Sequence, residues 1–408
     1  MPQRILFLEQ QTTRAGGQRV LDEVLCSLAP EFAPLVAFPE DGPYVDELRR
    51  RSIETLTYPL GRYRSGAKSL ADLLAFPLRS VHCAYQLAAI IRQRDVRLVY
   101  INGPRTLVAG VLAARLTELP SLFHLHMTMI RGADVFVATC AARRATKIIA
   151  CSETAAAALL EHDRRLEKRT QVIYSPVRKP GRSRSFESPD NPASGVIAAS
   201  AAGATVLGLV GRTTPGKGHH VLIEAGARLI ERGRDVHLVI VGAPDANSAE
   251  DAAYLARLKE LARGLGLESR IRWTGYQVDP DPYYRTFDVL VMPSTVREGL
   301  GLVALEAMQW GVPVVGSRLG GILEIVKDGV NGLLFTAGDS TALAETLERL
   351  LADSALRARL QAGARESVDG RFSIETFRDR IREVLFELCP SARPSTASLP
   401  LRPAGTRA

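Results

Sequence analysis

The amino-acid sequence predicts an α/β protein built from two doubly wound domains, each a parallel sheet with helices on both faces. Three observations support this prediction. The chain has 408 residues, a length typical of two or three domains. Hydrophobic residues make up 46% and charged residues 24% of it, as in ordinary globular proteins. Short runs rich in leucine or β-branched residues alternate with longer segments of helical periodicity, which is the pattern of parallel strands connected by helices.

The clearest elements follow this alternation along the chain. In the first half, the sequence predicts strands over 4–9, 98–101 and 122–126 and a helix over 18–29. In the second half, it predicts strands over 206–210, 236–241, 271–274, 289–292 and 312–315 and helices over 220–232, 252–263 and 342–351. Because doubly wound sheets bind ligands beyond the carboxyl ends of their strands, we expect the functional residues in the loops that follow these strands.

The predicted domains cover residues 1–178 and 205–370. Between them, residues 179–204 contain three prolines and several serines without a sustained hydrophobic period, which indicates a linker or surface loop. We expect residues 371–389 to form a helix that packs back toward the first domain. The last segment, 390–408, is rich in Pro, Ser, Thr and Arg and is predicted to be disordered.

The chain carries a net charge of +8, and the whole excess lies in its first half. Residues 1–190 contain 27 basic and 19 acidic residues, whereas residues 191–408 contain 25 of each. Such an excess can attract nucleic acid, an acidic membrane surface or a phosphorylated substrate, and it is also common in proteins that bind none of these. The arginines are spread out and no basic motif interleaved with aromatic residues is present, so we do not expect nucleic-acid binding.

The cysteines and the apolar segments indicate the compartment. Five widely spaced cysteines lack the short spacings of a zinc site and are predicted to be free thiols in a reducing environment. The first residues lack the apolar core of a signal peptide, and no apolar stretch is long enough to span a bilayer. We therefore expect a cytoplasmic protein.

The strand over 206–210 leads into a glycine-rich turn that carries two basic residues. This turn covers residues 211–218, includes Arg212 and Lys217, and precedes a helix that starts near His219. Backbone amides in such a turn can approach an anion, and the positive end of the helix adds to the attraction. The turn is therefore a candidate phosphate site, although it lacks P-loop spacing. The alternative is a tight turn with two exposed basic residues.

A second candidate cluster follows the strand over 289–292. Glu298 falls in the loop and Glu306 lies one or two turns into the next helix, about 10 Å apart at the rise of an α-helix. That separation suits a nucleotide sugar better than a shared proton or a metal ion. Gly299 and Gly301 would expose amides at the start of the helix, as a diphosphate requires. The helix around Glu306 is largely apolar, so its carboxylate needs a partner and is less suited to a merely solvated position.

Together these segments resemble glycosyltransferase family four, the retaining nucleotide-sugar glycosyltransferases. The resemblance covers nearly the whole second half, and the order and spacing of its motifs make it highly specific. The matching motifs are Val210-Gly211-Arg212, Lys217-Gly218, Gly275, Tyr284, Glu298-Gly299-Leu300-Gly301-Leu302-Val303, Leu305-Glu306-Ala307-Met308, Gly311-Val312-Pro313-Val314-Val315, Gly320-Gly321, Glu324-Ile325-Val326 and Asn331-Gly332-Leu333-Leu334-Phe335. The resemblance implies the GT-B fold, in which two Rossmann-like domains face each other across a cleft.

The resemblance also implies roles for individual residues of the second half. Glu298 would touch the transferred sugar and stabilise the positive charge that develops at its anomeric carbon, and Glu306 would bind the ribose hydroxyls. The donor diphosphate would be held by Arg212, Lys217 and the amides of Gly299, Leu300, Gly301 and Leu302. The nucleobase pocket would be lined by Thr274, Gly275 and Tyr276.

The first half matches the family more weakly, as expected of an acceptor-binding domain. Gly16 and Gly17 fit the glycine pair that approaches the diphosphate from across the cleft. The strand over 122–126 places His124 and His126 on one face, and His126 at its end is the better match to the family's histidine near the reacting sugar. Two histidines on one face could also bind zinc, but no third ligand is evident nearby.

We expect neither a metal ion nor another cofactor. The segment Asp279-Pro280-Asp281 imitates a metal-binding Asp-x-Asp motif, but it lies between prolines before a predicted helix and is interpreted as a turn and helix cap. An Arg/Lys phosphate site can neutralise the diphosphate without a divalent ion.

The resemblance therefore implies a retaining glycosyltransferase that moves a sugar from a nucleoside-diphosphate donor to an acceptor hydroxyl. The acceptor would be a glycan, a lipid-linked molecule or a small molecule in polysaccharide, glycolipid or glycoconjugate biosynthesis. The basic first half could make peripheral contact with anionic lipid at the inner membrane face. The alternatives are a nucleotide-sugar epimerase of similar fold and a non-catalytic nucleotide-sugar-binding protein. The sequence does not define the base, the sugar, the acceptor or the oligomeric state.

Overall fold

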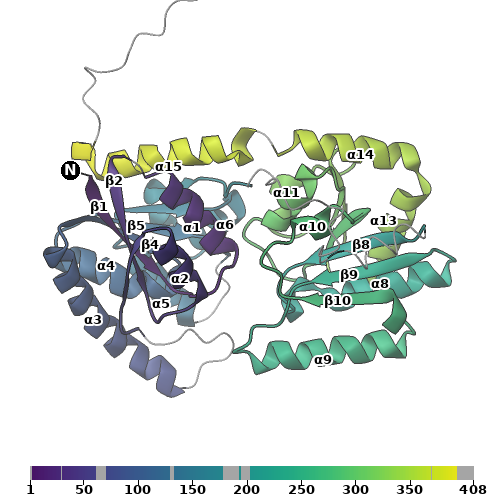
Figure 1. The fold of residues 1–408 in the computed structure, drawn as a ribbon, viewed down its shortest axis with the longest axis horizontal. Coiled ribbons are helices and arrows are strands. Elements are labelled where there is room, and N and C mark those ends of the chain that lie inside the picture. The colour runs from purple at the N-terminus through teal and green to yellow at the C-terminus, as the bar shows by residue number, and fades with distance from the viewer. Residues whose placement is uncertain are drawn as a thin grey trace, which may run out of the picture.

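The computed structural model describes residues 2–28, 30–60, 70–128, 133–177, 193, 203–368 and 370–392. They form two α/β domains side by side, as Figure 1 shows, and confirm the predicted fold class. The first sheet has seven parallel strands in the order β3-β2-β1-β4-β5-β6-β7. Their bounds are β1 (Gln3–Glu9), β2 (Phe32–Phe38), β3 (Glu54–Thr57), β4 (Val96–Asn102), β5 (Ser121–Leu125), β6 (Lys147–Ala150) and β7 (Thr170–Val172).

The second sheet has six parallel strands in the order β10-β9-β8-β11-β12-β13. Their bounds are β8 (Thr205–Val210), β9 (Val236–Val241), β10 (Ile271–Gly275), β11 (Val289–Met292), β12 (Val314–Ser317) and β13 (Gly332–Phe335). In both sheets the strand order reverses direction next to the first strand of the domain. Such a reversal leaves a crevice at the carboxyl ends of the strands, where ligands bind.

Helices connect the strands of each sheet and cover both of its faces. In the first domain they are α1 (Gly16–Cys26), α2 (Pro43–Arg50), α3 (Leu70–Gln93), α4 (Leu107–Leu116), α5 (Ala133–Ala142) and α6 (Glu153–Leu160). In the second domain they are α8 (His219–Glu231), α9 (Ala249–Gly264), α10 (Asp281–Tyr284), α11 (Leu302–Gln309), α12 (Ile322–Ile325), α13 (Ser340–Ala352) and α14 (Ser354–Glu366).

Strand β1 shows how the first sheet is buried on both faces. Ile5 and Phe7 belong to one hydrophobic cluster and Leu6 and Leu8 to another, because successive residues of a strand point to opposite faces. All four side chains are almost fully buried. This is why the strand has a continuous apolar sequence rather than an alternating one.

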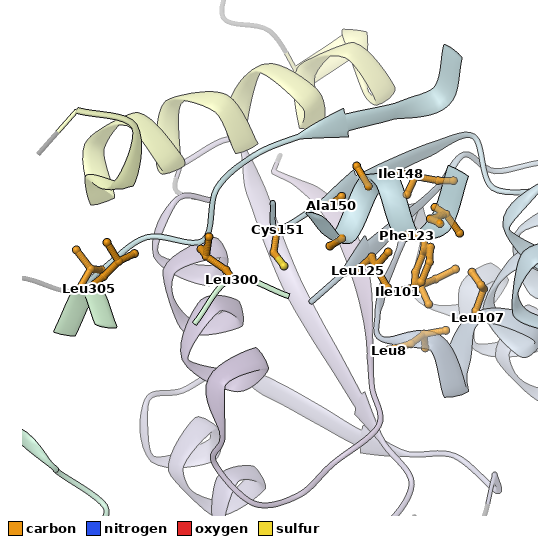
Figure 2. Close-up of a cluster of buried hydrophobic side chains, with 14 of the residues drawn as sticks. Leu8, Ile101, Leu107, Phe123, Leu125, Ile148, Ala150, Cys151, Leu300 and Leu305 are labelled. Atoms are coloured by element: carbon orange, nitrogen blue, oxygen red, sulfur yellow. The ribbon is translucent and has the colours of Figure 1, made fainter. Parts of the chain in front are cut away.

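One hydrophobic cluster continues from the first domain into the second. It contains Leu8 and Leu125 of the first sheet, Cys151 after β6, and Leu300 and Leu305 of the second domain. Figure 2 shows Leu300 beside Cys151, at the point where the two domains meet. The loop that contains Leu300 is therefore anchored by apolar packing against the opposite domain.

The C-terminal helix α15 (Ile374–Leu388) crosses back and lies against the first domain, as Figure 1 shows. Its apolar face, which includes Phe377 and Ile381, joins the cluster beneath α1. Arg378 donates to Glu23 at 2.6 Å and extends the contact to α1 through an ion pair. The predicted disordered segment begins with a short 3-10 turn over Pro390–Ala392, and residues 393–408 lie outside the described residues.

Several element boundaries differ from the sequence-based expectation. Strand β12 runs over Val314–Ser317 rather than 312–315, since Pro313 has no amide to donate and lies before the strand. Helix α1 covers Gly16–Cys26 rather than 18–29, and β5 ends at Leu125, one residue before His126. Most of the predicted linker over 179–204 lies outside the described residues. Among the described helices, none is both long and apolar enough to cross a membrane.

Candidate active site

The loops at the carboxyl ends of the two sheets bring the predicted residues of both domains together. A Cβ atom built on Gly17, at the start of α1, would lie 3.6 Å from Cδ2 of His126. A Cβ atom built on Gly16 would lie 3.9 Å from Leu302, and one on Gly299 would lie 2.8 Å from the carbonyl oxygen of His126. These close approaches place the glycine pair, the histidine and the loop before α11 at one junction between the domains.

Lys217 and Glu298 form an ion pair at this junction. Nζ of Lys217 donates to Oε2 of Glu298 at 2.6 Å, and the hydroxyl of Ser294 contacts the other carboxylate oxygen. Burial raises the pKa of Glu298, but the nearby Lys217 charge and the two hydrogen bonds outweigh it, so the pKa lies below its ordinary value. The pair therefore places one positive and one negative charge side by side in the loops that follow the carboxyl ends of β8 and β11.

The turn after β8 is fixed by a close backbone contact. Gly218 has a φ of 69° and caps α8, and a Cβ atom there would lie 1.8 Å from the carbonyl oxygen of Pro293. Only glycine fits this approach, which aligns the turn with the loop after β11. Arg212 lies in the same turn with its side chain 58% exposed, and its guanidinium is 3.8 Å from Asp245. It is accessible to an anion that enters from solvent.

Glu306 lies in the second turn of α11, as predicted, and its carboxylate has partners from two directions. Arg19 of α1 donates to Oε1 at 2.8 Å, and the hydroxyl of Tyr284 donates to Oε2 at 2.6 Å. Arg19 belongs to the first domain, so this contact bridges the domains. Each carboxylate oxygen accepts one of these bonds and has a second lone pair for another donor. The expectation that Glu306 needs a partner is confirmed.

The loop between the two glutamates contains a row of amides without hydrogen-bonding partners among the described residues. The backbone N–H groups of Gly299, Leu300, Gly301 and Leu302 donate no hydrogen bond to any described residue. Gly301 has a φ of 95° and starts α11, while Gly321 supports the loop so closely that a Cβ atom there would lie 2.2 Å from the carbonyl oxygen of Gly299. Amides without partners at a helix start can bind an anion, which is the kind of site that the sequence predicts.

The predicted base pocket lies at the end of β10. The Thr274 hydroxyl donates to the carbonyl of Gly275 at 3.1 Å, and that carbonyl also accepts from the amide of Gly242 at 2.9 Å. The Tyr276 side chain is 57% exposed, and its hydroxyl donates to the carbonyl of Arg14 in the first domain at 3.1 Å. The side chains of Thr274 and Tyr276 are thus held by backbone groups, and the ring of Tyr276 remains accessible.

His126 and His124 lie side by side, as the strand alternation predicts, with ring centroids 3.9 Å apart. Nε2 of His126 is 2.6 Å from Oδ1 of Asn102, and Nδ1 of His124 faces the hydroxyl of Tyr100. Burial lowers the pKa of His126 to about 4. No group of three or more potential metal ligands is found among the described side chains. One ring nitrogen of each histidine thus has a hydrogen-bonding partner.

The segment Asp279-Pro280-Asp281 forms a turn that leads into α10, as predicted. The amide of Asp281 donates to Oδ1 of Asp279 at 3.1 Å and begins the helix there. Burial, assisted by the negative charges of Asp279 and Glu306, raises the pKa of Asp281 to about 6. The Asp279 carboxylate therefore serves the local turn.

Several contacts at the site are not predicted from the sequence. Besides Arg19, the first domain contributes Ser152, whose hydroxyl donates to the carbonyl of Gly299, and Thr128, whose hydroxyl donates to the carbonyl of Arg297 at 2.6 Å. The Glu324 carboxylate accepts from the amides of Glu153 and Thr154 at the start of α6, at 2.9 and 2.7 Å. Of these residues, only Arg19 could have been suspected from the sequence, because it follows the glycine pair on the same helix.

Two family models match this chain, one for each domain. The model described as "Glycosyltransferase Family 4" matches residues 15–178, and the model described as "Glycosyl transferases group 1" matches residues 197–367. The lipopolysaccharide core biosynthesis glycosyltransferase LpsE of Rhizobium meliloti (strain 1021) is 38% identical over 184 residues, which is 45% of this chain and 50% of that protein. The D-inositol 3-phosphate glycosyltransferase of Salinispora arenicola (strain CNS-205) is 36% identical over 200 residues, 48% of this chain and 44% of that protein. These matches span about half the length of the curated relatives.

Solved structures resemble the whole described fold. The crystal structure of Anabaena Alr3699/HepE in complex with UDP-glucose has a TM-score of 0.79 and 26% identity, and the match covers 94% of this chain and 99% of that one. The apo form of the lipopolysaccharide outer core galactosyltransferase WaaB has a TM-score of 0.66 and 18% identity over 93% of this chain and 99% of that one, and it shares the fold.

Proposed function

This chain belongs to the family-four nucleotide-sugar glycosyltransferases, and we propose that it transfers a sugar from a nucleoside-diphosphate donor to an acceptor hydroxyl with retention of configuration. One arrangement supports the proposal most directly. Four amides without partners among the described residues lie between Glu298 and Glu306, in a segment whose Leu302 side chain approaches Gly16 of the other domain. An anion at the amides and a hydroxyl-rich group at each carboxylate would together match the parts of a nucleotide sugar.

The leaving group of this reaction is a nucleoside diphosphate, whose new negative charge has to be stabilised. We assign this role to Lys217, to Arg212 and to the amides of residues 299–302. Preorganised donors that face a developing charge in a site closed to water lower the barrier because they need no reorganisation during the reaction. Gly16 and Gly17 would allow the diphosphate to approach the start of α1 from the opposite side.

Glu298 would contact the transferred sugar and stabilise the positive charge at its anomeric carbon, while Glu306 would accept from the ribose hydroxyls. No carboxylate is assigned as a covalent nucleophile. We therefore propose a displacement on one face of the sugar, in which the departing phosphate helps to deprotonate the acceptor. Closure of the domains around the donor would keep water out and limit hydrolysis.

We propose a UDP-sugar as the first donor to test, because the Anabaena protein with 26% identity was solved with UDP-glucose. Relatives named for lipopolysaccharide core biosynthesis and for D-inositol 3-phosphate favour an acceptor from surface-glycan or glycolipid synthesis. We also propose that the transfer needs no divalent cation, because basic side chains and amides would neutralise the diphosphate. Unchanged turnover in excess EDTA would support this, whereas loss of turnover that magnesium restores would refute it.

The proposal is tested by mixing the purified chain with UDP-, GDP- and ADP-sugars and measuring release of the nucleoside diphosphate with lysate glycans or glycolipids as acceptors. Glu298→Ala should abolish nearly all release, whereas Glu260→Ala, at an exposed glutamate on α9, should leave it unchanged. Conversion of the donor to an epimer without an acceptor would identify an epimerase instead. Tight donor binding without any conversion would identify a binding protein.

We further propose that the protein acts in the cytoplasm and contacts an anionic bilayer through α3. Leu78, Val81 and Tyr85 lie on one outer face of this helix and are 75%, 45% and 63% exposed. Arg79 is exposed beside them, and residues 73–93 contain no acidic residue, which complements anionic lipid. Leu78→Glu should reduce sedimentation with phosphatidylglycerol vesicles. Equal sedimentation with neutral vesicles, or none at low salt, would refute the proposal.

A further inference from the structure

A buried carboxylate lies behind the site in the first domain, and the reaction described above does not use it. Glu9 ends β1 and is fully buried. Its Oε1 accepts from the amides of Gln10 at 2.7 Å and Gln11 at 2.9 Å and from Nε2 of Gln18 at 2.8 Å. Its Oε2 accepts from Nδ2 of Asn102. All four partners are donors, and the two backbone amides can be nothing else, so the site is built for an ionised carboxylate.

The Asn102 amide connects this carboxylate to His126. When its NH2 group donates to Glu9, its Oδ1 must face Nε2 of His126, and the two atoms lie 2.6 Å apart. A carbonyl oxygen can only accept, so Nε2 has to carry the hydrogen. The opposite orientation of Asn102 would place its oxygen against the negatively charged Glu9. An ionised Glu9 therefore selects the Nε2–H tautomer of His126.

The other ring nitrogen of His126 is then an acceptor without a partner. Nδ1 is buried and bonds to none of the described residues. Burial lowers the pKa of His126 to about 4, so the ring is neutral at physiological pH and Nδ1 keeps its lone pair. The His126 ring packs at Gly17 and the His126 backbone packs at Gly299. His126 therefore lies at the junction between the two domains. A buried acceptor at a ligand site requires a donor from the ligand.

We propose that Glu9 is a positioning residue that acts through Asn102 to hold His126 as the Nε2–H tautomer, so that Nδ1 accepts from a sugar or acceptor hydroxyl. This inference rests on the proposed function for the identity of the hydroxyl. Protonation of Glu9 would allow Asn102 to reverse and His126 to adopt the opposite tautomer, in which Nδ1–H can no longer accept.

The ionisation of Glu9 gives a second observable consequence. Burial raises the pKa of Glu9 to about 7, although the hydrogen bonds that it accepts lower it. The other titratable groups facing it are the phenols of Tyr44 and Tyr58, which stay neutral because burial raises the pKa of each, and His126 beyond Asn102. Since only ionised Glu9 selects the active tautomer, kcat of the wild-type protein should fall as the pH drops through about 7.

The test is Glu9→Gln, read out by nitrogen NMR of the histidine side chains. The uncharged amide no longer dictates the orientation of Asn102, so His126 should lose its pure Nε2–H signature. His124, held by Tyr100, should keep its own tautomer and serve as an internal reference. With UDP-glucose as donor, we expect kcat to fall about tenfold, which is the effect of one lost hydrogen bond. The decrease of kcat below about pH 7 that is expected for the wild type should be absent from the variant. UDP affinity should not change, because UDP lacks the transferred sugar whose hydroxyl would donate to His126.

The matched control is Asp163→Asn, which changes another buried carboxylate of the same domain. The Asp163 side chain is 5% exposed and pairs with Arg143 and Arg165 away from the site. This variant should lose stability but keep the His126 tautomer and kcat. If Glu9→Gln does not fold, Asn102→Ala removes the link while leaving the other three donors to Glu9, and it should give mixed tautomers with the same loss of kcat.

An unchanged His126 signature in either folded variant would overturn the inference, as would wild-type kcat. A wild-type protein that converts no donor would instead refute the proposed function, while the NMR comparison would still decide whether Glu9 controls the tautomer.

Discussion

Replacement of Lys217 by methionine removes the positive charge beside Glu298 while keeping a side chain of similar length. Nζ of Lys217 lies 2.6 Å from Oε2 of Glu298, and the two side chains are 28% and 17% exposed. The carboxylate charge is shared by both oxygens, so the charge centres are about 4 Å apart. At an effective dielectric constant of about 20 the attraction is then about 4 kcal/mol, and partial exposure to water reduces it to about 2 kcal/mol. Loss of one cation from the leaving-group site should lower kcat by about 100- to 1,000-fold.

Chemical denaturation and turnover of the same preparations measure the two effects separately. The pKa of Glu298 is lowered in the folded state, so the ion pair stabilises the protein above the ordinary glutamate pKa and loses this contribution as pH falls through the folded value. The stability difference between Lys217→Met and the wild type should therefore be full at neutral pH and narrow below about pH 4.

Lys147→Met provides the matched control. Lys147 is also mostly buried and pairs with a glutamate, Glu387 of α15, on the far side of the first domain. It should lose some stability and keep full kcat. A Lys217→Met enzyme within twofold of wild-type kcat, or one whose stability deficit does not depend on pH, would refute the assignment of Lys217.

Three further substitutions probe the contacts between the domains. Gly299→Ala should lower the free energy of unfolding by about 1–3 kcal/mol and remove most activity, because the new Cβ would meet the His126 carbonyl oxygen at 2.8 Å. A denaturation midpoint and an activity that both match the wild type would contradict this. Arg19→Gln should destabilise the protein by only about 1 kcal/mol, since the Arg19 side chain is 36% exposed. Calorimetry should nevertheless show weaker UDP binding, because Glu306 loses its ion pair with Arg19. Unchanged UDP affinity would argue against a role for this ion pair. Glu324→Gln should reduce stability by about 1 kcal/mol because a charged cap is lost from α6, and a stability equal to that of wild type in urea would count against the cap.

The strands and the cleft loops of the second domain could be predicted from the sequence. Strands β9 and β11 have the predicted bounds, and α8 starts at His219 as expected, because apolar runs and glycine turns act locally. Edge strands of the first sheet were harder to identify. Strand β3 covers only Glu54–Thr57 and is half-buried, so its sequence carries little apolar signal.

The sequence by itself determined the two-domain α/β class and the local chemistry of each loop: the basic turn at Lys217, the glutamates flanking an amide-rich helix start, and the glycine pair. Only the tertiary structure decided which charges meet. Arg19 reaches Glu306 across 287 positions of sequence, and Glu9 reaches His126 through Asn102 on a neighbouring strand. The reason is physical. Local sequence sets backbone conformation, whereas the partner of a buried charge depends on which strand ends and domain faces are brought together by packing.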